Sequence, residues 1–594
     1  MAKKLIYAGG TNDLAVFEKR VKKAKECGFT HVDISRFVDR SRWENDDPKD
    51  PWLQWNMGTT SFFRVIVPDE LKDFVPPETA ADNLALITAK GKILEKYGLK
   101  GIFSSHDPSW LPESFFDIHP DWRGPRIDHP RRAVHKRFSA CMDHPGVLKL
   151  YRDTVCRFLT LVPSIDTLTL YSNDSGSGMC WSEYLYNGKN GPSHCKNISV
   201  GKRVAKFLQE IRNGAMDAGI TAEVTMSAQF SATEIDGILS ELPEGTGLMD
   251  WDDWRIARGQ ELFVKMPIAP AYSPMLNIPH YYALADMPER TRTANKVISY
   301  IPSAFDDTHD DYLDMIHHML SKETYNILDR NALLEKMAER QVGRAHAPDL
   351  MKAWELIDTG MASFNAPRVG NNLLWIAVVM EKWISRPLVP FPLELTEEEN
   401  GYYRMHQFQA KGDATAADMM NCQDAYFIDS RAGASFLETY WSFAIIDKFN
   451  EACAILRRIA AALNDANRCE ELTATVFALE VLLSLARTCI HICHFQTFMY
   501  LFPEPESVAE ATYDRGDHNR QFIYEIYRAE IDNTRTLMRL LRDTPRPVLS
   551  TGARADQEDV NTLSPNIAEH LEKKIKIMMD HWQDFDRIFP RPNK

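Results

Sequence analysis

The stretch 170–181 carries side chains that are well suited to acid–base chemistry. Its apolar run ends just before Asn173 and Asp174, and two glycines follow shortly after. Glycine tolerates a tight or left-handed backbone, so a ligand can approach such a turn closely. We expect Asp174 to serve as a general acid, Asn173 to bind the substrate and Trp181 to stack on a sugar ring. The same letters also suit a plain turn in which Asp174 caps the next helix.

A second acidic group lies between two tryptophans in the stretch 247–255 and consists of Asp250, Asp252 and Asp253. In glycosidases one carboxyl group protonates the leaving oxygen, and another activates water or attacks the sugar carbon. We expect Asp252 to be that second carboxylate, paired with Asp174, while Asp250 and Asp253 bind the substrate. A solvated surface turn would explain these residues without any chemistry.

Three further candidates lie near the ends of predicted strands. His106 can act as acid, base or hydrogen-bond donor to a substrate hydroxyl, and we expect Asp107 to orient it. Trp110, which follows closely, and Asp33, within the run His31–Ser35, are expected to bind the substrate. Purely structural roles explain a lone histidine equally well.

The connection around residues 121–132 is rich in arginine. Arg123 and Arg126 could clamp a carboxylate or phosphate through bidentate hydrogen bonds, and such a clamp points to an acidic sugar. A loop held together by ion pairs would use the same residues. We count Arg123 among the expected substrate ligands.

The first half of the chain must position these side chains, and it alternates short β-branched runs with amphipathic stretches, as parallel β–α units do. Apolar spacing predicts helices over 14–27, 80–97, 145–161 and 200–218. Eight such strands with intervening helices predict a TIM (β/α)8 barrel, whose active sites lie at the carboxyl ends of the strands. The predicted strands are 5–8, 31–35, 101–105, 167–172, 223–227, 247–250, 262–268 and 296–302.

Beyond about residue 310 the strand pattern stops, and stretches such as 445–463 and 522–541 have helical spacing. We therefore expect two domains, because a chain of 594 residues exceeds what one core usually sustains. Residues 1–315 would form the barrel, and residues 316–594 a mostly α-helical C-terminal domain. The helical domain would also be the part that holds a homodimer together.

Composition excludes several classes of partner. The 69 Lys and Arg against 83 Asp and Glu give a net charge of −14, and no basic stripe offsets it, so a nucleic-acid partner is not expected. No run approaches the ~18 uninterrupted apolar residues of a membrane-spanning helix, so we expect a soluble chain without a membrane partner. Ten cysteines without a CxxC pair fit reduced thiols in a cytoplasm.

One short stretch, Cys489-Ile-His491-Ile-Cys493-His494, contains zinc-ligand types. Positions 489 and 493 share one helix face while 491 does not, so we interpret the stretch as part of a core helix. No glycine-rich nucleotide motif and no HExxH motif stands in a supporting context. We accordingly expect neither a metal nor a cofactor.

Two segments, Ser172-Asn-Asp-Ser-Gly-Ser-Gly178 and His119-Pro-Asp-Trp-Arg-Gly124, resemble bacterial glycoside hydrolases of the barrel superfamily. The layout is most similar to the family 67 α-glucuronidases and the family 20 β-N-acetylhexosaminidases, over about the first half of the chain. The resemblance implies an acid at the end of the fourth strand, where Asp174 stands in place of their glutamate. It implies a base on a later strand, where Asp250 or Asp252 stands.

Our leading hypothesis is an exo-acting glycosidase on a small acidic or N-acetylated glycan, with Asp174 as acid and Asp252 as base. Its partner would be a small oligosaccharide or glycoside. One alternative is a divalent-metal sugar isomerase or aldolase with His106, Asp174 and Asp250 as ligands. Another alternative is a non-catalytic carbohydrate-binding barrel. This alternative stays open because Asp174 stands where the resembling families have a glutamate.

Overall fold

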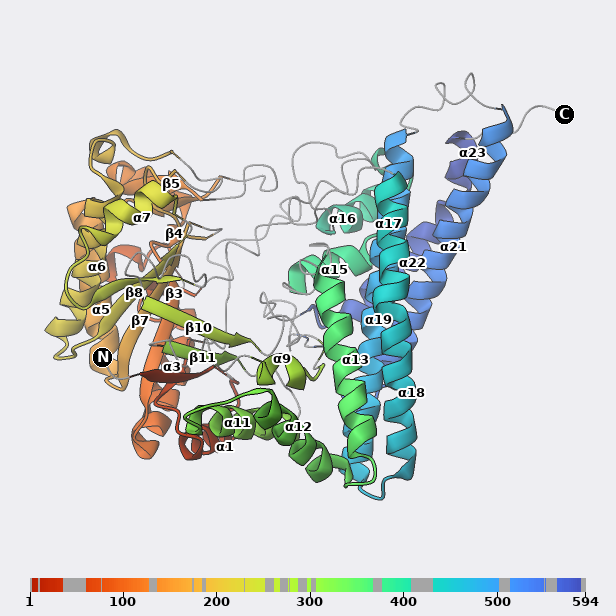
Figure 1. Ribbon diagram of the computed structural model, residues 1–594. Coiled ribbons are helices and arrows are strands. Elements are labelled where there is room, and N and C mark those ends of the chain that lie inside the picture. Colours follow the sequence, from red (N-terminus) through yellow and green to blue (C-terminus); the bar gives the residue numbers. More distant parts are fainter. Residues whose placement is uncertain are drawn as a thin grey trace.

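The structure is a computed structural model with a parallel β-sheet in its N-terminal half and long packed helices in its C-terminal half (Figure 1). In it the two halves lie side by side. The described residues are 3–8, 11–35, 60–75, 77–127, 136–173, 176–183, 189–228, 230–250, 261–267, 276, 278–286, 296–300, 306–366, 377–406, 431–501, 513–549, 551 and 563–588.

Eight strands pair in parallel, in the order β1-β11-β10-β9-β8-β7-β3-β2, and β2 returns to β1, so the sheet curls into a closed barrel. All eight predicted strands are present, with ends within about two residues of the expected ones. The strands are β1 (Lys4–Ala8), β2 (His31–Asp33), β3 (Lys100–His106), β7 (Ile165–Ser172), β8 (Glu223–Ala228), β9 (Thr246–Asp250), β10 (Glu261–Pro267) and β11 (Lys296–Tyr300).

Helices lie outside this sheet, and the four predicted from spacing are confirmed. Their starts follow from capping: Asp13 accepts hydrogen bonds from two backbone amides of the first turn of α1, and Ser199 caps α6. The segment 251–260 between β9 and β10 lies outside the described residues, so a full eightfold β/α repeat stays a prediction. The helices are α1 (Leu14–Glu26), α3 (Pro77–Tyr97), α5 (Pro145–Leu161), α6 (Val200–Asp217), α7 (Ala232–Leu239), α9 (Tyr281–Ala285) and α11 (Asp306–Ser321).

The barrel interior is layered. At the amino-terminal end of the strands, Glu223 pairs with Lys4 at 2.6 Å and with Lys296, so strands on opposite sides of the ring are joined by charge. Burial, and secondarily the charge of Lys4, lowers the pKa of Lys296 to about 7. Above them Ile6, Ile102 and Met249 form a small apolar cluster of their own. This cluster lies beneath the carboxyl end of the barrel.

The connection after β3 contains a small antiparallel sheet that sequence reasoning took for a loop. Its order is β4-β6-β5, with β4 at Trp110–Leu111, β5 at Arg123–Arg126 and β6 at Phe138–Ala140. Such short strands are pinned by tertiary contacts more than by propensity, so no periodicity announces them. A short helix, α4 (Glu113–Ile118), lies between the first two of these strands in sequence.

The C-terminal half is helical, as predicted, and α18 and α21 confirm the expected helices near 445–463 and 522–541. Helix α11 runs through residue 315, so the exact domain boundary stays a prediction. Lys23 of α1 pairs with Asp314 of α11 at 2.6 Å, which fastens α11 to the barrel side. The remaining helices are α12 (Ile327–Val342), α13 (Ala347–Asn365), α15 (Ala377–Ser385), α16 (Glu397–Met405), α17 (Arg431–Trp441), α18 (Asp447–Ala462), α19 (Ala466–Leu501), α21 (Tyr513–Asp543), α22 (Ile567–Asp580) and α23 (Phe585–Ile588).

Helix α19 is the central helix of this half, and α17, α18 and α21 pack against it. Among the described helices it is the one long and apolar enough to cross a membrane, but 78% of its most apolar window is buried inside the protein. A helix that is hydrophobic all round suits such a core position. Cys489 and Cys493 are fully buried in it, as expected for a core helix.

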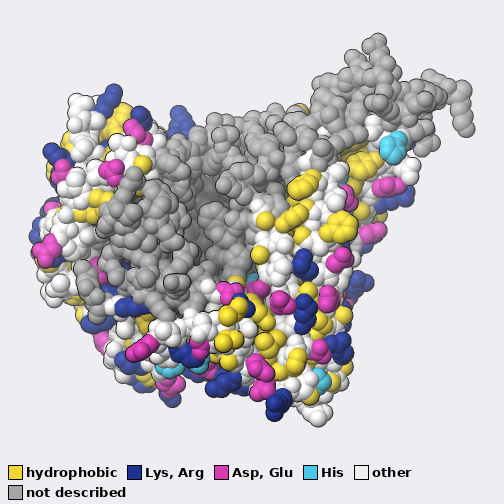
Figure 2. Space-filling view, viewed as in Figure 1, with side chains coloured by type: hydrophobic (Ala, Val, Ile, Leu, Met, Phe, Trp, Pro, Cys, Tyr) yellow, Lys and Arg dark blue, Asp and Glu magenta, His cyan; other side chains and the backbone are white. Residues whose placement is uncertain are grey.

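Hydrophobic side chains also gather on the exposed surface of the helical half (Figure 2). Phe436 in α17 is 67% exposed and Phe443, just beyond it, is 73% exposed. Phe436 stacks on the ring of Tyr440 at a centroid distance of 5.9 Å. Contiguous exposed apolar groups of this kind often mark an interaction surface.

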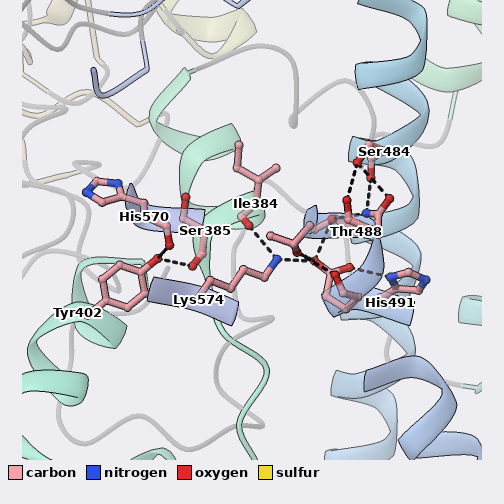
Figure 3. A network of polar contacts seen from close by, with 11 residues as sticks. Ile384, Ser385, Tyr402, Ser484, Thr488, His491, His570 and Lys574 are labelled. Atoms are coloured by element: carbon pink, nitrogen blue, oxygen red, sulfur yellow. Dashed lines mark hydrogen bonds and ion pairs between the residues drawn. The ribbon is translucent and has the colours of Figure 1, made fainter. Parts of the chain in front are cut away.

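A buried ion pair joins three helices of this half (Figure 3). Glu530 of α21 pairs with Lys574 of α22, and both side chains are completely buried. Glu530 also accepts hydrogen bonds from Thr488 at 2.9 Å and from His491 at 2.7 Å, both on α19. Burial alone would raise the pKa of Glu530, but Lys574 and His491 outweigh it and lower that pKa to about 2. Lys574 donates a further hydrogen bond to the carbonyl of Ile384.

We predict that Lys574→Met lowers the free energy of unfolding by about 3–5 kcal/mol, because it leaves the Glu530 carboxylate buried without its counter-ion. Thermal and urea unfolding followed by tryptophan fluorescence would measure the loss. Lys573→Met is the matched control, since Lys573 is 39% exposed and pairs only with an exposed glutamate. Equal losses of stability in the two variants would contradict the conclusion that the buried pair of Glu530 and Lys574 is the source of the loss.

Candidate active site at the carboxyl ends of the barrel strands

Polar side chains line the barrel interior where β2, β3 and β7 end. Ile102 belongs to the apolar cluster inside the barrel, and residues alternate along a strand, so Ser104 and His106 face inward as well. His106 is in register with Tyr171 of β7, and the centroids of the two rings are 5.6 Å apart. An imidazole and a phenol therefore stand side by side, both partly exposed, at the carboxyl end of the sheet.

Asp33 adds a carboxylate to this group. It accepts hydrogen bonds from the amide of Ser35 at 2.9 Å, the hydroxyl of Ser35 at 2.5 Å and the hydroxyl of Ser104 at 3.4 Å. Burial raises the pKa of Asp33, and these hydrogen bonds only partly offset the effect. The structure thus brings Asp33 and His106, both expected from sequence, to the same end of the barrel through Ser104.

Asp107 does not take the orienting role expected of it. Its fully buried carboxylate accepts hydrogen bonds from Ser61 at 3.1 Å and Tyr151 at 3.0 Å, and it is directed at the outer layer around α5. Burial raises the pKa of Asp107 to about 6 against the opposing hydrogen bonds. Because side chains alternate along the chain, the residue after inward-facing His106 turns outward.

Asn173 shapes the turn after β7. Its backbone is left-handed, with φ of 61°, and its side chain is fully buried. The amide oxygen accepts a hydrogen bond from the amide of Met179 at 3.1 Å, and the amide nitrogen donates to Ser182 at 2.9 Å. The expectation that Asn173 binds substrate is corrected accordingly, because both ends of its amide hold the loop.

The predicted acid and base fall outside the described residues: Asp174, Asp252 and Asp253 have no described placement. Asp250 is the last residue of β9, at the carboxyl end of the barrel, and only its backbone is described. Their roles therefore stay predictions from sequence.

Neither predicted aromatic platform presents an open face. Trp110 is fully buried in β4, and Arg137 lies over its ring at 5.8 Å, so it is a packing residue of the small sheet. Trp181 is partly exposed, but its indole donates a hydrogen bond to the carbonyl of Pro192 at 2.9 Å and Lys196 covers its ring at 5.1 Å. The substrate-binding expectation for Trp110 is corrected because burial removes its surface from any ligand.

Arg123 is held by an ion pair within its own connection, which is the alternative to substrate binding that the sequence left open. It pairs with Glu113 at 2.8 Å and lies over the rings of Phe116 and Phe138, at 5.4 and 4.8 Å. The guanidinium is thus already occupied within the small sheet. The expectation that Arg123 clamps substrate stays a prediction, and the side chain, 36% exposed, would have to leave Glu113 to do so.

Sequence reasoning missed Tyr171 and Ser104. The available signal was the period of two along each strand: once Ile102 is placed inside the barrel, Ser104 and His106 must follow it. Tyr171 required knowing which residue of β7 lies beside His106, and a single chain does not reveal that register.

Two groups of described residues bring metal-binding side chains together. Glu381, His406 and His570 meet in the helical half, where Glu381 already binds His570 at 2.8 Å. Burial and the nearby charge of Lys382 lower the pKa of His406 well below its usual value, and this cationic setting disfavours a dication. The second group, Cys141, Cys180 and Cys195, lies behind the turn that Asn173 shapes.

The chain matches no protein-family model and no curated protein. Among solved structures, a variant O-GlcNAc hydrolase of Thermobaculum terrenum is 10% identical, with 98% of this chain and 96% of that chain covered at a TM-score of 0.38. A family 36 α-galactosidase of Geobacillus stearothermophilus is 11% identical over 54% of this chain and 41% of its own, at 0.29. A family 20 module of the pneumococcal exo-β-D-N-acetylglucosaminidase is 10% identical over 61% and 92%, at 0.31. Likenesses this distant establish no activity.

Replacing Asn173 should separate its two contributions. Asn173→Ala loses both hydrogen bonds and places a Cβ-bearing residue without a compensating side chain in the left-handed region, so we expect a loss of about 2–4 kcal/mol. Asn173→Gly loses the same hydrogen bonds but tolerates the backbone, so its loss should be smaller by roughly 1 kcal/mol. Thermal unfolding of both variants tests this, and a more damaging glycine variant would contradict it.

The raised pKa of Asp107 predicts that the stability of the protein depends on pH. Its folded value of about 6 exceeds the unfolded value, so the stabilisation it provides is complete below about pH 4 and is lost as pH rises through 6. As pH rises from 4 to 7, the free energy of unfolding of Asp107→Asn should therefore increase relative to that of the parent by up to about 3 kcal/mol. Unfolding midpoints across that range would measure it. The exposed Asp117→Asn is the control, and a parallel shift there would contradict the prediction.

Proposed function

We propose that this chain is a glycosidase that hydrolyses a small oligosaccharide or glycoside at the carboxyl end of a complete (β/α)8 barrel. The observation that carries the proposal is the group of inward-facing polar side chains, Asp33, Ser104, His106 and Tyr171, above a small apolar cluster. Hydroxyl-rich ligands need several convergent donors and acceptors beside an apolar surface, and this group offers both.

An apolar cluster lies below the polar group. Ile6, Ile102 and Met249 are at most 3% exposed and pack together in the barrel interior. A ligand would enter from the side where the strand-to-helix connections lie, as in other barrels. We propose that the enzyme is exo-acting and removes a terminal sugar that enters from this end.

The chemistry is divided between the described residues and the predicted ones. His106 and Asp33 would bind sugar hydroxyls, since an imidazole can donate or accept and a carboxylate accepts. Asp174 directly follows the Asn173 turn and would protonate the leaving oxygen, while Asp252, beyond β9, would act as base or nucleophile. These two roles rest on the sequence alone.

The ion pair of Arg123 with Glu113 bears on the proposed substrate class. Because this guanidinium is engaged, we favour a neutral or N-acetylated glycoside over an acidic one. We further propose a cytoplasmic enzyme that needs no cofactor. We also propose a homodimer formed through the helical half, which the exposed Phe436 and Phe443 support.

The test is hydrolysis of a broad panel of aryl glycosides and short oligosaccharides by the parent chain and by Asp174→Asn. Loss of a general acid should lower kcat by about 100- to 10,000-fold with little change in binding. Asp236→Asn, an exposed aspartate of α7 outside the barrel, is the matched control and should leave the rate unchanged.

Three outcomes would redirect the proposal. Unchanged hydrolysis by Asp174→Asn would remove that residue as the acid. Tight binding across the panel without turnover would favour a carbohydrate-binding protein. Turnover of free sugars that depends on added Mg²⁺ or Mn²⁺ would favour an isomerase or aldolase.

A further inference from the structure

Three cysteines far apart in sequence meet behind the barrel mouth. The sulfur of Cys141 lies 3.6 Å from that of Cys180 and 3.9 Å from that of Cys195, and the three sulfurs all lie within 4.8 Å of one another. All three side chains are fully buried, in a small cluster of their own beside Trp181. The residue pairs are 39 and 54 positions apart, so the fold alone brings them together.

These distances match a metal-binding set of thiolates. With Zn–S bonds of about 2.3 Å, two sulfurs of a tetrahedral zinc site lie roughly 3.8 Å apart. Disulfide sulfurs lie about 2.05 Å apart, and three thiols cannot all be paired among themselves. The observed distances of 3.6 and 3.9 Å fit an edge of the zinc tetrahedron.

His194 is the nearby candidate for a fourth donor. Its Nε2 atom lies 3.4 Å from the sulfur of Cys141, close to the roughly 3.5 Å that Zn–N and Zn–S bonds imply for neighbouring ligands. It does not belong to the group of ligand atoms that lie within 4.8 Å of one another, which contains the three cysteines alone. The histidine side chain is exposed and can turn toward the sulfurs. We propose that Cys141, Cys180 and Cys195 form a structural zinc site that His194 completes when the ion binds. Four protein ligands leave no position for substrate or water, which makes the site structural.

The surroundings suit the charge of such a site. Zn²⁺ displaces three thiol protons on binding, so the ion with three thiolates and a neutral imidazole carries one negative charge. Arg203 of α6 is 1% exposed, donates to the carbonyl of Cys180 and lies 3.7 Å from the carboxylate of Asp143. This guanidinium is shared with Asp143, and it holds the ligand loop through the carbonyl of Cys180.

The backbone holds the ligands in place. The amide of Cys141 donates to the carbonyl of Trp122 at 2.7 Å, and the carbonyl of Cys195 accepts from Ile198 at 3.1 Å. A Cβ at Gly191 would approach the Cβ of Cys180 to 3.0 Å, so this close approach needs glycine. Such ordered surroundings orient metal ligands before the ion binds.

The site would tie together two connections of the barrel, the one from β3 to α5 and the one from β7 to α6. Cys141 follows β6, Cys180 lies in the connection after β7, and His194 and Cys195 belong to the short 3-10 turn Ser193–Cys195 that precedes α6. One ion would therefore fix the connection that begins with Asn173. Its role is to keep that connection in place, whichever reaction the barrel performs.

The experiment measures metal in the full-length chain produced in zinc-supplemented medium. We expect one zinc per chain by mass spectrometry of the metal, and none in Cys141→Ser, Cys180→Ser or Cys195→Ser. Cys453→Ser is the matched control, because Cys453 is an equally buried thiol in the helical half. His194→Ala should retain zinc more weakly than the parent, and a strong chelator should lower the Tm of the parent but not of Cys180→Ser.

Cobalt replacement gives a readout that does not depend on how the variants fold. Co²⁺ bound to the parent chain should show the intense visible bands of tetrahedral thiolate coordination. A parent chain without stoichiometric zinc and without these bands would overturn the proposal, as would equal zinc in all the cysteine variants. Neither measurement uses turnover, so failure of the glycosidase proposal would leave this result unaffected.

Discussion

Pairing of β1 with β11, from Lys4 opposite Lys296 to Ala8 opposite Tyr300, is the constraint on which the candidate site depends. It joins the last strand to the first and closes the sheet into a ring. One face of every strand therefore points into the barrel. The pairing register of the strands then decides which side chains point into the barrel interior. A shift of one residue in β3 would turn Ser104 and His106 outward and Phe103 inward.

The ring also explains the sorting of charge within the barrel. Glu223 can pair with Lys4 and Lys296 only because closure brings β1, β8 and β11 to a common interior. Above these ions, Ile6, Ile102 and Met249 pack together in the middle of the barrel. The candidate site lies above them at the carboxyl end, where long connections can reach a ligand.

Much of this architecture was predictable from local pattern. The eight strands and the helices α1, α3, α5 and α6 follow from periodicity and from caps such as Asp13, which act within a few residues. The small sheet β4-β6-β5 could not be predicted in this way, because its short strands are specified by contacts with residues that are distant in sequence. The roles expected of Trp110 and Asn173 failed for a related reason: residue type indicates what a side chain can bind, while packing decides whether it is free to bind.

The sequence by itself determined the alternation of strands and helices, the helical second half and the strand-end positions of Asp33 and His106. These depend on spacing along the chain, which hydrophobic burial converts directly into faces. Only the tertiary structure decided that His106 stands beside Tyr171, that Asp107 turns away, and that three scattered cysteines meet. Contacts across such separations are set by register and closure, which no local pattern encodes.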